Sequence, residues 1–364
     1  MLARALGRSA PEWPWPVGVH AAGRKAAHGL VARRRGVPGT RGGWGKADLR
    51  TVIMRLYRLL RWVRQSRIRI LAYHGVDERD DPVINFDGLQ VTPAVFEEHL
   101  RIIRRDYHPL TLRQVTAALY GEVPPPSRAV VLTFDDGYLN NYSIAAPLLE
   151  KYGIPATFFL TTGFIGSSQD MWWYRVRRAV AWAVGEIPSP DGRKGMKLSG
   201  VRERVAAVRV WEDSLRRMPF IAREQRVERL VKECGTEPGG GLLYPPMSWD
   251  QVRDLARRGF EIGAHTIHHV WLGAESGEVV REEIGCSIKS VRREIAGVKA
   301  DAFSLPYGAD AMDIQSLLEE CGVRAAVTTR HGLAHVHGDP WRLPRLNIGR
   351  HEGTAFMMLL AGMV

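Results

Sequence analysis

Short, unbroken apolar runs that stop abruptly at polar residues constrain the fold of this 364-residue chain more than any other feature. In chain order these runs read RIRILAYH, AVVLTFDD, ATFFLTTG, FEIGAH, ADAFSLPY and RAAVTT. Strands that are buried on both faces, as in parallel sheets, show continuous rather than alternating apolar residues. The runs therefore predict a parallel sheet with polar residues at the ends of its strands.

Helical patterns separate the apolar runs. The segment 140–153 places apolar residues on one face and stops at Gly153, a position typical of a left-handed helix cap. The segment 248–260 begins with Ser248 and Gln251 in the spacing of a capping box. Strands that alternate with helices indicate βα units, so we expect a protein of the α/β class.

One block interrupts this alternation. Residues 165–247 combine tryptophan-rich and charged helical stretches with Pro- and Gly-rich segments, which predicts a helical insertion after one strand. Trp172, Trp173 and Trp182 could form a platform on which sugars stack, or they could pack inside the insertion. We favour packing, because aromatic residues at helical spacing usually face a core.

Basic residues concentrate before the first strand and supply much of the net charge of +12. Residues 1–53 hold ten Arg and Lys residues against two acidic ones and are rich in Gly and Pro, which predicts a disordered basic extension. An alternative is that translation begins at Met54. Residues 54–66 read as a basic amphipathic helix, which either packs on the domain or, through residues 54–69, contacts an anionic membrane surface.

Localisation and partners follow from what the sequence lacks. It shows neither the apolar stretch of a signal peptide nor the roughly 18 apolar residues of a membrane-spanning helix. We therefore expect a cytoplasmic or membrane-peripheral protein rather than a secreted one. No helix-turn-helix, zinc-finger or RNA-binding signature accompanies the positive charge, so we expect no specific nucleic-acid partner. The oligomeric state stays open.

Side chains capable of chemistry follow four of the predicted strands. In parallel α/β folds the loops at the carboxyl ends of the strands converge on one rim, so these side chains can form a single site. The residues are His74, Asp135, Asp136, His265, His269 and Tyr307.

The aspartates and the histidines together favour a metal site. His265 lies three residues before His268 and four before His269, and either spacing can place two imidazoles on one ion. Two histidines with one carboxylate leave positions open on the metal, as in catalytic zinc sites. Separately, the histidines could be a hydrogen-bonded surface pair, and Asp-Asp-Gly could be a simple turn.

The motifs TFDDGY, HTIHH and LPYG, in this order, resemble the first three motifs of the polysaccharide deacetylases, carbohydrate esterase family 4, with the NodB-homology fold. The resemblance extends from LAYHGVDE to LPRLNI, roughly three quarters of the chain. It implies a distorted parallel (β/α) barrel, commonly with seven strands, over residues 67–364. LAYHGVDE also resembles the first strand of a circularly permuted subset that includes poly-N-acetylglucosamine deacetylases.

The resemblance also implies roles for individual residues. Asp136, His265 and His269 would bind the metal, which we expect to be zinc, with other first-row divalent ions as alternatives. Asp135 would be the general base, and a backbone N–H near Tyr307 would stabilise the oxyanion. His268 would be a neighbour of the ligands and not a ligand itself.

Two departures from the family pattern need replacements. The third motif usually has Arg two residues before the proline, where this chain has Ser304, and Arg345 is our candidate to orient the catalytic aspartate instead. The late leucine-x-x-histidine motif, the usual source of the general acid, is missing, since the chain after Leu346 reads NIGRH and His351 falls out of the pattern. The permuted subset uses an amino-terminal histidine, which implies His74 as the acid. The competing candidates for that role are His331, His335 and His337.

The expected function is metal-dependent removal of N-acetyl groups from a polysaccharide or glycan precursor. Alternatives are a hydrolase of another non-peptide amide on the same fold, and a non-catalytic protein that binds glycans or anionic surfaces. A glycosidase fits poorly, because its two carboxylates stand at least about 5 Å apart across a sugar, whereas Asp135 and Asp136 are adjacent.

Overall fold

The structure is a computed structural model that describes residues 67–236, 241–308 and 314–363. The extension expected over residues 1–53 and the amphipathic helix expected over residues 54–66 lie outside the described residues. Among the described residues, no helix combines the length and the apolar character needed to span a membrane.

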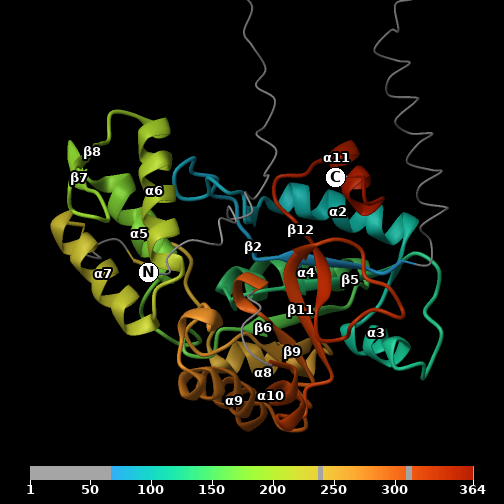
Figure 1. Cartoon of the computed structure of the whole chain (residues 1–364). Helices are drawn as coiled ribbons and strands as arrows, with labels where there is room; N and C mark the ends of the chain where they lie inside the picture. Colours follow the sequence, from blue (N-terminus) through green and yellow to red (C-terminus); the bar gives the residue numbers. More distant parts are fainter. Residues whose placement is uncertain (1–66, 237–240, 309–313, 364) are drawn as a thin grey trace, which may run out of the picture. The chain divides into compact units, whose positions relative to one another are not determined.

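Seven parallel strands close into a barrel, and they follow one another around it in chain order (Figure 1). The barrel closes because the first strand pairs with both the second and the last. The strands are β1 (Arg69–Tyr73), β5 (Ala129–Phe134), β6 (Ala156–Leu160), β9 (Glu261–Ala264), β10 (Ala302–Ser304), β11 (Ala325–His331) and β12 (Leu343–Asn347). Short β4 (His108–Pro109) pairs with β5 outside the ring. The predicted α/β barrel is confirmed.

The unbroken apolar character of the strands follows from burial on both faces. Every residue of β1, β5 and β6 is buried. Leu71 and Leu132, which pair with each other, belong to a cluster that includes residues of the surrounding helices. Their neighbours Ile70 and Val131 belong to a second cluster on the opposite face. Alternation is absent because neither face meets water.

Helices cover the outside of the barrel. They are α2 (Pro93–Asp106), α3 (Leu112–Leu119), α4 (Ala146–Tyr152), α8 (Trp249–Arg257), α9 (Gly277–Glu294), α10 (Ile314–Glu320) and α11 (Gly353–Leu360). The expected helix ends are confirmed: α4 stops at Gly153 with φ of 61°, and Ser248 and Gln251 form a capping box at α8. Short elements complete the fold: β2 (Gly75–Val76), β3 (Gln90–Val91), η1 (Asn141–Ala145), η2 (Leu272–Ala274) and η3 (Pro306–Gly308).

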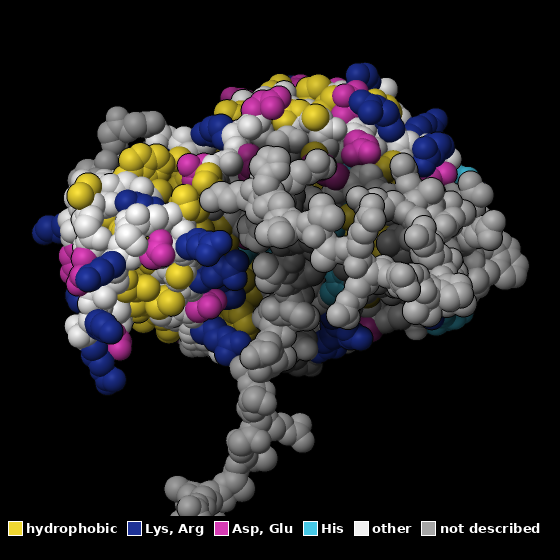
Figure 2. Space-filling model, turned by 90° about the horizontal axis from the view of Figure 1, so that it is seen from above, with side chains coloured by type: hydrophobic (Ala, Val, Ile, Leu, Met, Phe, Trp, Pro, Cys, Tyr) yellow, Lys and Arg dark blue, Asp and Glu magenta, His cyan; other side chains and the backbone are white. Residues whose placement is uncertain are grey.

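The chain between β6 and α8 forms a lobe beside the barrel, which we call the insertion (Figure 1). It contains α5 (Trp172–Trp182), β7 (Glu186–Pro188), β8 (Gly195–Lys197), α6 (Val201–Arg216) and α7 (Phe220–Glu233). Trp172 and Trp173 are buried in its apolar cluster, as the packing interpretation expected. Trp182 instead is 56% exposed, and Figure 2 shows hydrophobic side chains beside Lys and Arg on the surface of this lobe.

Candidate metal centre

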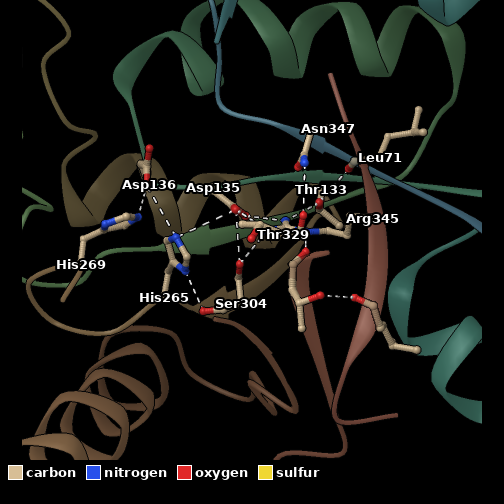
Figure 3. A network of polar contacts seen from close by, with 12 residues as sticks. Leu71, Thr133, Asp135, Asp136, His265, His269, Ser304, Thr329, Arg345 and Asn347 are labelled. Carbon is tan, nitrogen blue, oxygen red and sulfur yellow. Dashed lines mark hydrogen bonds and ion pairs between the residues drawn. The ribbon is translucent and has the colours of Figure 1, made fainter. Parts of the chain in front are cut away.

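Three of the predicted residues meet at the carboxyl ends of β5 and β9. Asp136 follows β5, while His265 and His269 lie in the loop after β9 (Figure 3). One potential ligand atom from each lies within 4.8 Å of those of the other two, and all three residues are buried. The barrel therefore gathers residues that are more than a hundred positions apart in the sequence.

The hydrogen bonds of this cluster leave its inner atoms free. The Nδ1 atom of His265 donates to the carbonyl oxygen of Ser304 at 2.7 Å, so the Nε2 atom keeps its lone pair. The Oδ1 atom of Asp136 is buried without a hydrogen-bond partner, 3.7 Å from Nε2 of His265 and 3.5 Å from Nε2 of His269. A buried carboxylate oxygen normally requires a partner. A divalent cation would supply one, and two imidazoles with a carboxylate suit zinc.

The electrostatics of the cluster also fit the binding of a cation. Burial, reinforced by the charge of Asp135, raises the pKa of Asp136 to about 8. Burial lowers the pKa of His265, and it holds the pKa of His269 well below its ordinary value. Near neutral pH the metal-free cluster therefore has uncharged histidines and a protonated Asp136, and a bound cation would reverse the preference of that carboxyl.

Asp135 lies beside this cluster, with its Oδ2 atom 3.9 Å from Nε2 of His265, and it is held by Arg345 from β12 (Figure 3). The Nη1 and Nη2 atoms of Arg345 donate to the two carboxylate oxygens of Asp135 at 2.9 and 2.6 Å. The hydroxyl of Ser304 donates to Oδ2 of Asp135 at 3.3 Å. Burial opposes ionisation of Asp135, but the charge and hydrogen bonds of Arg345 outweigh it and hold the pKa of Asp135 well below the usual range.

The backbone after β5 explains how adjacent aspartates serve two different environments. Asp136 has φ of 76° and Gly137 has φ of 91°, so the chain turns sharply where the strand ends. A side chain at position 137 would also meet Ile165, whose Cδ1 lies 2.6 Å from an ideal Cβ. Asp135 thus continues the strand toward the barrel interior, and Asp136 points to the histidines.

His74 follows β1 and is partly buried. Burial lowers the pKa of His74 to about 4, while Asp135 opposes this shift and Arg345 adds to it. Its Nδ1 atom is buried without a hydrogen-bond partner. Of the competing histidines, His335 and His337 instead lie against each other, with ring centroids 5.5 Å apart. His74 is thus electrostatically coupled to the catalytic candidate Asp135.

Tyr307 contributes its side chain to this region. Its hydroxyl lies 3.0 Å from Nδ1 of His269 and accepts a hydrogen bond from Nε1 of Trp172 at 3.3 Å. The sequence did not predict these contacts of the Tyr307 hydroxyl. It also did not predict that Arg223 and Glu283 bind the loop after β9 that carries the histidines. No local motif marks these residues, because each acts across a long sequence separation.

Together, the closed barrel and the cluster at its strand ends define an α/β-barrel protein with a candidate metal site. The sequence model of the family described as polysaccharide deacetylase matches residues 122–201 and 212–326, more than half of the chain. The chain therefore belongs to the polysaccharide deacetylase family, as its motifs predicted.

Curated relatives are about one third identical to this chain over short aligned stretches. The poly-beta-1,6-N-acetyl-D-glucosamine N-deacetylase of Escherichia coli (strain K12) is 33% identical over 109 residues, which cover 30% of this chain and 16% of that protein. A protein of the same name from Staphylococcus epidermidis is 36% identical over 110 residues, 27% of this chain and 37% of that protein. The matched parts are well under half of these relatives, whose names fit the permuted subset.

Solved structures share the fold over most of the chain. The deacetylase PplD of Streptococcus pyogenes, solved in complex with acetate, aligns with a TM-score of 0.55 over 81% of this chain and 98% of that one. IcaB of Ammonifex degensii aligns with a TM-score of 0.54 over 82% and 97%. Both are 18% identical to this chain, so the likeness supports the fold alone.

Proposed function

We propose that this protein is a metal-dependent deacetylase that removes N-acetyl groups from an amino-sugar polymer. The observation that carries the proposal is the cluster of Asp136, His265 and His269 with the Arg345-bound Asp135 beside it. Family membership and the names of the curated relatives support the substrate class. We further propose zinc as the resident ion, with other first-row divalent ions as alternatives.

Asp136, His265 and His269 would hold the ion through the atoms that face one another in the cluster. A divalent metal supplies polarisation of a carbonyl oxygen and acidification of water at neutral pH. Binding requires that Asp136 lose its proton, whereas both histidines are already neutral. Three protein ligands leave room for substrate and water, as catalytic sites require.

Asp135 is suited to act as the general base because its position is fixed. Its two hydrogen bonds from Arg345 and one from Ser304 fix the plane of the carboxylate. The same contacts keep Asp135 ionised, so it can accept a proton from attacking water at any pH in the neutral range. Arg345 thereby takes the orienting role that Ser304 cannot fill.

His74 is our proposed proton donor to the leaving amine. With a pKa of about 4 it is neutral in the resting protein, so it must gain a proton during the reaction before it can donate one. We propose that its source is the proton that Asp135 takes from water, since the charge of Asp135 favours the protonated form of His74. The backbone N–H near Tyr307 remains our candidate for stabilising the oxyanion.

Metal analysis of the purified protein beside an acetate-release assay on N-acetylglucosamine oligomers tests this proposal. We expect about one metal per chain, which Asp135→Asn retains and His269→Ala loses, and we expect both variants to lose activity. If wild-type protein supplied with metal neither retains it nor releases acetate from any of several glycans, the proposal is wrong. Retained metal with release of another acyl group would instead indicate a different amide substrate.

The remaining expectations about partners stay predictions. No observation tests the expected cytoplasmic or membrane-peripheral location or the expected lack of a specific nucleic-acid partner, and both are expectations from the sequence. Contact with a membrane surface through residues 54–69 falls almost entirely outside the described residues. The presence of Asp135 beside the complete cluster of Asp136, His265 and His269 counts against a non-catalytic glycan-binding role.

A further inference from the structure

A buried arginine of the insertion contacts the loop that carries both histidine ligands. Arg223 lies on α7 and is 1% exposed. Its Nη1 atom donates to the carbonyl oxygen of His269 at 3.0 Å, and its Nη2 atom donates to that of His268 at 2.9 Å. We propose that Arg223 is a positioning residue for the ligand His269, so that the insertion is needed for tight metal binding. This inference rests on the metal site proposed above.

The loop needs such restraint because its backbone is strained. Thr266 has φ of 64° and His269 has φ of 51°, in the left-handed region that residues with side chains rarely adopt. A residue in this region raises the free energy of the folded chain and persists only where its surroundings enforce it. Within the loop, the N–H of His269 donates to the hydroxyl of Thr266 at 3.0 Å. That single local bond leaves the carbonyl groups to be held from outside.

A carboxylate on a helix of the barrel accepts hydrogen bonds from backbone N–H groups of the same loop. Glu283 of α9 is buried, and its Oε2 atom accepts from the backbone N–H of Ile267 at 2.8 Å and of His268 at 3.0 Å. Its Oε1 atom lies 2.6 Å from Nδ1 of His268. The backbone N–H groups of Thr162 and Gly163 also donate to the carbonyl oxygens of Thr266 and Ile267 at 3.0 and 2.9 Å. Glu283 and Arg223 are thus the charged side chains that hold this loop, beside these backbone contacts. His268 serves the contact with Glu283, consistent with a neighbour that does not bind metal.

The insertion also reaches the ring of His269. The ring of Trp173 meets that imidazole edge to face, with centroids 4.8 Å apart. Trp172 donates to the Tyr307 hydroxyl, which in turn contacts Nδ1 of His269. Partners outside the ligand set that orient a metal-binding histidine typically change metal affinity about 10–100-fold when mutated. Arg223 belongs to this class of residue, although it acts through the backbone.

The competing explanation is that Arg223 only attaches the insertion to the barrel. Its guanidinium lies 5.3 Å from the Trp172 ring and 5.5 Å from the Phe220 ring, so it also packs in the lobe. A purely structural role predicts lower stability with unchanged metal affinity below the melting temperature. A positioning role predicts weaker metal binding by protein that is still folded.

The test compares the full-length variants Arg223→Gln and Arg223→Lys with wild type. The matched control is Arg226→Gln, one turn along α7, because Arg226 donates to the carbonyl oxygen of Pro190 inside the insertion. The dissociation constant for Zn²⁺ is measured by competition with a chromophoric chelator, and the melting temperature of each metal-free protein is measured in parallel. We expect Arg223→Gln to weaken Zn²⁺ binding about 10–100-fold, Arg223→Lys to weaken it less, and Arg226→Gln to leave it unchanged.

The outcomes separate this inference from the proposed function. If wild type binds Zn²⁺ and both Arg223 variants bind it equally well, Arg223 is not a positioning residue, while the metal site stands. If Arg223→Gln does not fold, the dissociation constant of Arg223→Lys for Zn²⁺ tests the inference: weaker binding than wild type supports it, and equal binding overturns it. Weaker binding by Arg226→Gln as well would overturn the inference, because any damage to the lobe would then suffice. Failure of wild type to bind Zn²⁺ would overturn the proposed site, and this inference with it.

Discussion

Arg345 and Asp135 form a bidentate salt bridge inside the barrel, although 210 positions separate them in the sequence. Arg345 is 1% exposed and Asp135 is 2% exposed, so solvent screens their interaction little. The guanidinium also donates to Ser304 and Thr133, which fixes it independently of its partner. A rigid arginine of this kind orients the carboxylate and keeps it ionised.

Replacing Arg345 by Met should therefore raise the pKa of Asp135 and leave its carboxylate free to rotate. We expect the rate of acetate release to fall about 10²-fold, since small misplacements of a catalytic group have costs of this size. Metal content should change little, because Arg345 contacts none of the proposed ligands through a hydrogen bond or ion pair that the structure describes. Steady-state kinetics with metal analysis measures both, and full activity in the variant would contradict the orienting role.

An arginine placed at position 304 should restore part of that activity. Ser304 is fully buried and its hydroxyl already contacts both Asp135 and Arg345. In the double variant Ser304→Arg, Arg345→Met, the new guanidinium can occupy the space that the old one leaves. We expect more activity than in Arg345→Met alone, and Ser304→Arg alone serves as the control that should be overpacked and impaired. If the double variant were no more active than Arg345→Met alone, an arginine at position 304 could not replace Arg345.

Removing the His74 side chain should slow catalysis without loosening the metal. General acids typically contribute about 10²–10⁴-fold, so we expect a decrease in this range for His74→Gln. His335→Gln is the control, because His335 faces His337 rather than the catalytic candidates. Acetate release and Zn²⁺ affinity are measured on the same samples. If the rate of acetate release fell more in His335→Gln than in His74→Gln, His335 and not His74 would be the better candidate for the general acid.

Metal binding should release a proton from Asp136. The pKa of Asp136 is raised to about 8 in the metal-free protein, so at pH 7 the carboxyl holds a proton that the ion must displace. His265 and His269, with lowered pKa values, are neutral and release none. We expect about one proton per ion at pH 7 and less above pH 8, measured by calorimetry in buffers of different ionisation enthalpy.

The same pKa sets how stability depends on pH. Between about pH 4 and pH 8 the folded, metal-free protein keeps on Asp136 a proton that the unfolded chain has already lost. The contribution of Asp136 to stability therefore decreases as pH rises through this window, and added metal should restore it at the alkaline end. Urea unfolding at pH 6 and pH 8, with and without Zn²⁺, measures the difference between wild type and Asp136→Asn. Identical pH trends in the two metal-free proteins would contradict the raised pKa.

Gly163 should tolerate no side chain. Its N–H donates to the carbonyl of Ile267, and a Cβ at position 163 would lie 2.8 Å from that oxygen. We expect Gly163→Ala to lower the free energy of unfolding by about 1–3 kcal/mol, as overpacking does. Gly285→Ala is a matched control in α9, where the nearest atom is 4.0 Å away, and it should stabilise the protein by up to about 1 kcal/mol. Equal effects in urea unfolding would count against the close contact.

Much of the barrel could be predicted because its strands follow simple rules. Burial on both faces gives continuous apolar runs, and each run ends where the chain reaches the rim, so Asp135, Asp136 and His265 were marked by position alone. Asp136 and the histidines also have the chemical character of ligands. The family match from residue 122 to residue 326 covers this central part of the chain.

Contacts between distant elements could not be predicted in the same way. His74 and Arg345 lie outside the matched residues. Arg345 was suggested only because position 304 lacks the arginine that the family usually has there. Arg223 and Glu283 read as ordinary charged residues of amphipathic helices. Their importance depends on where α7 and α9 dock, and helix docking leaves no signature in local sequence.

The order of strands around the barrel has a consequence for protein synthesis. β12, which carries Arg345, is the last barrel strand to leave the ribosome, and it must insert beside β1, the first. Until β12 inserts, the carboxylate of Asp135, next to that of Asp136, lacks the guanidinium of Arg345 as its partner. A nascent chain that has made six of the seven strands thus contains every proposed metal ligand, but it still lacks the arginine that pairs with Asp135.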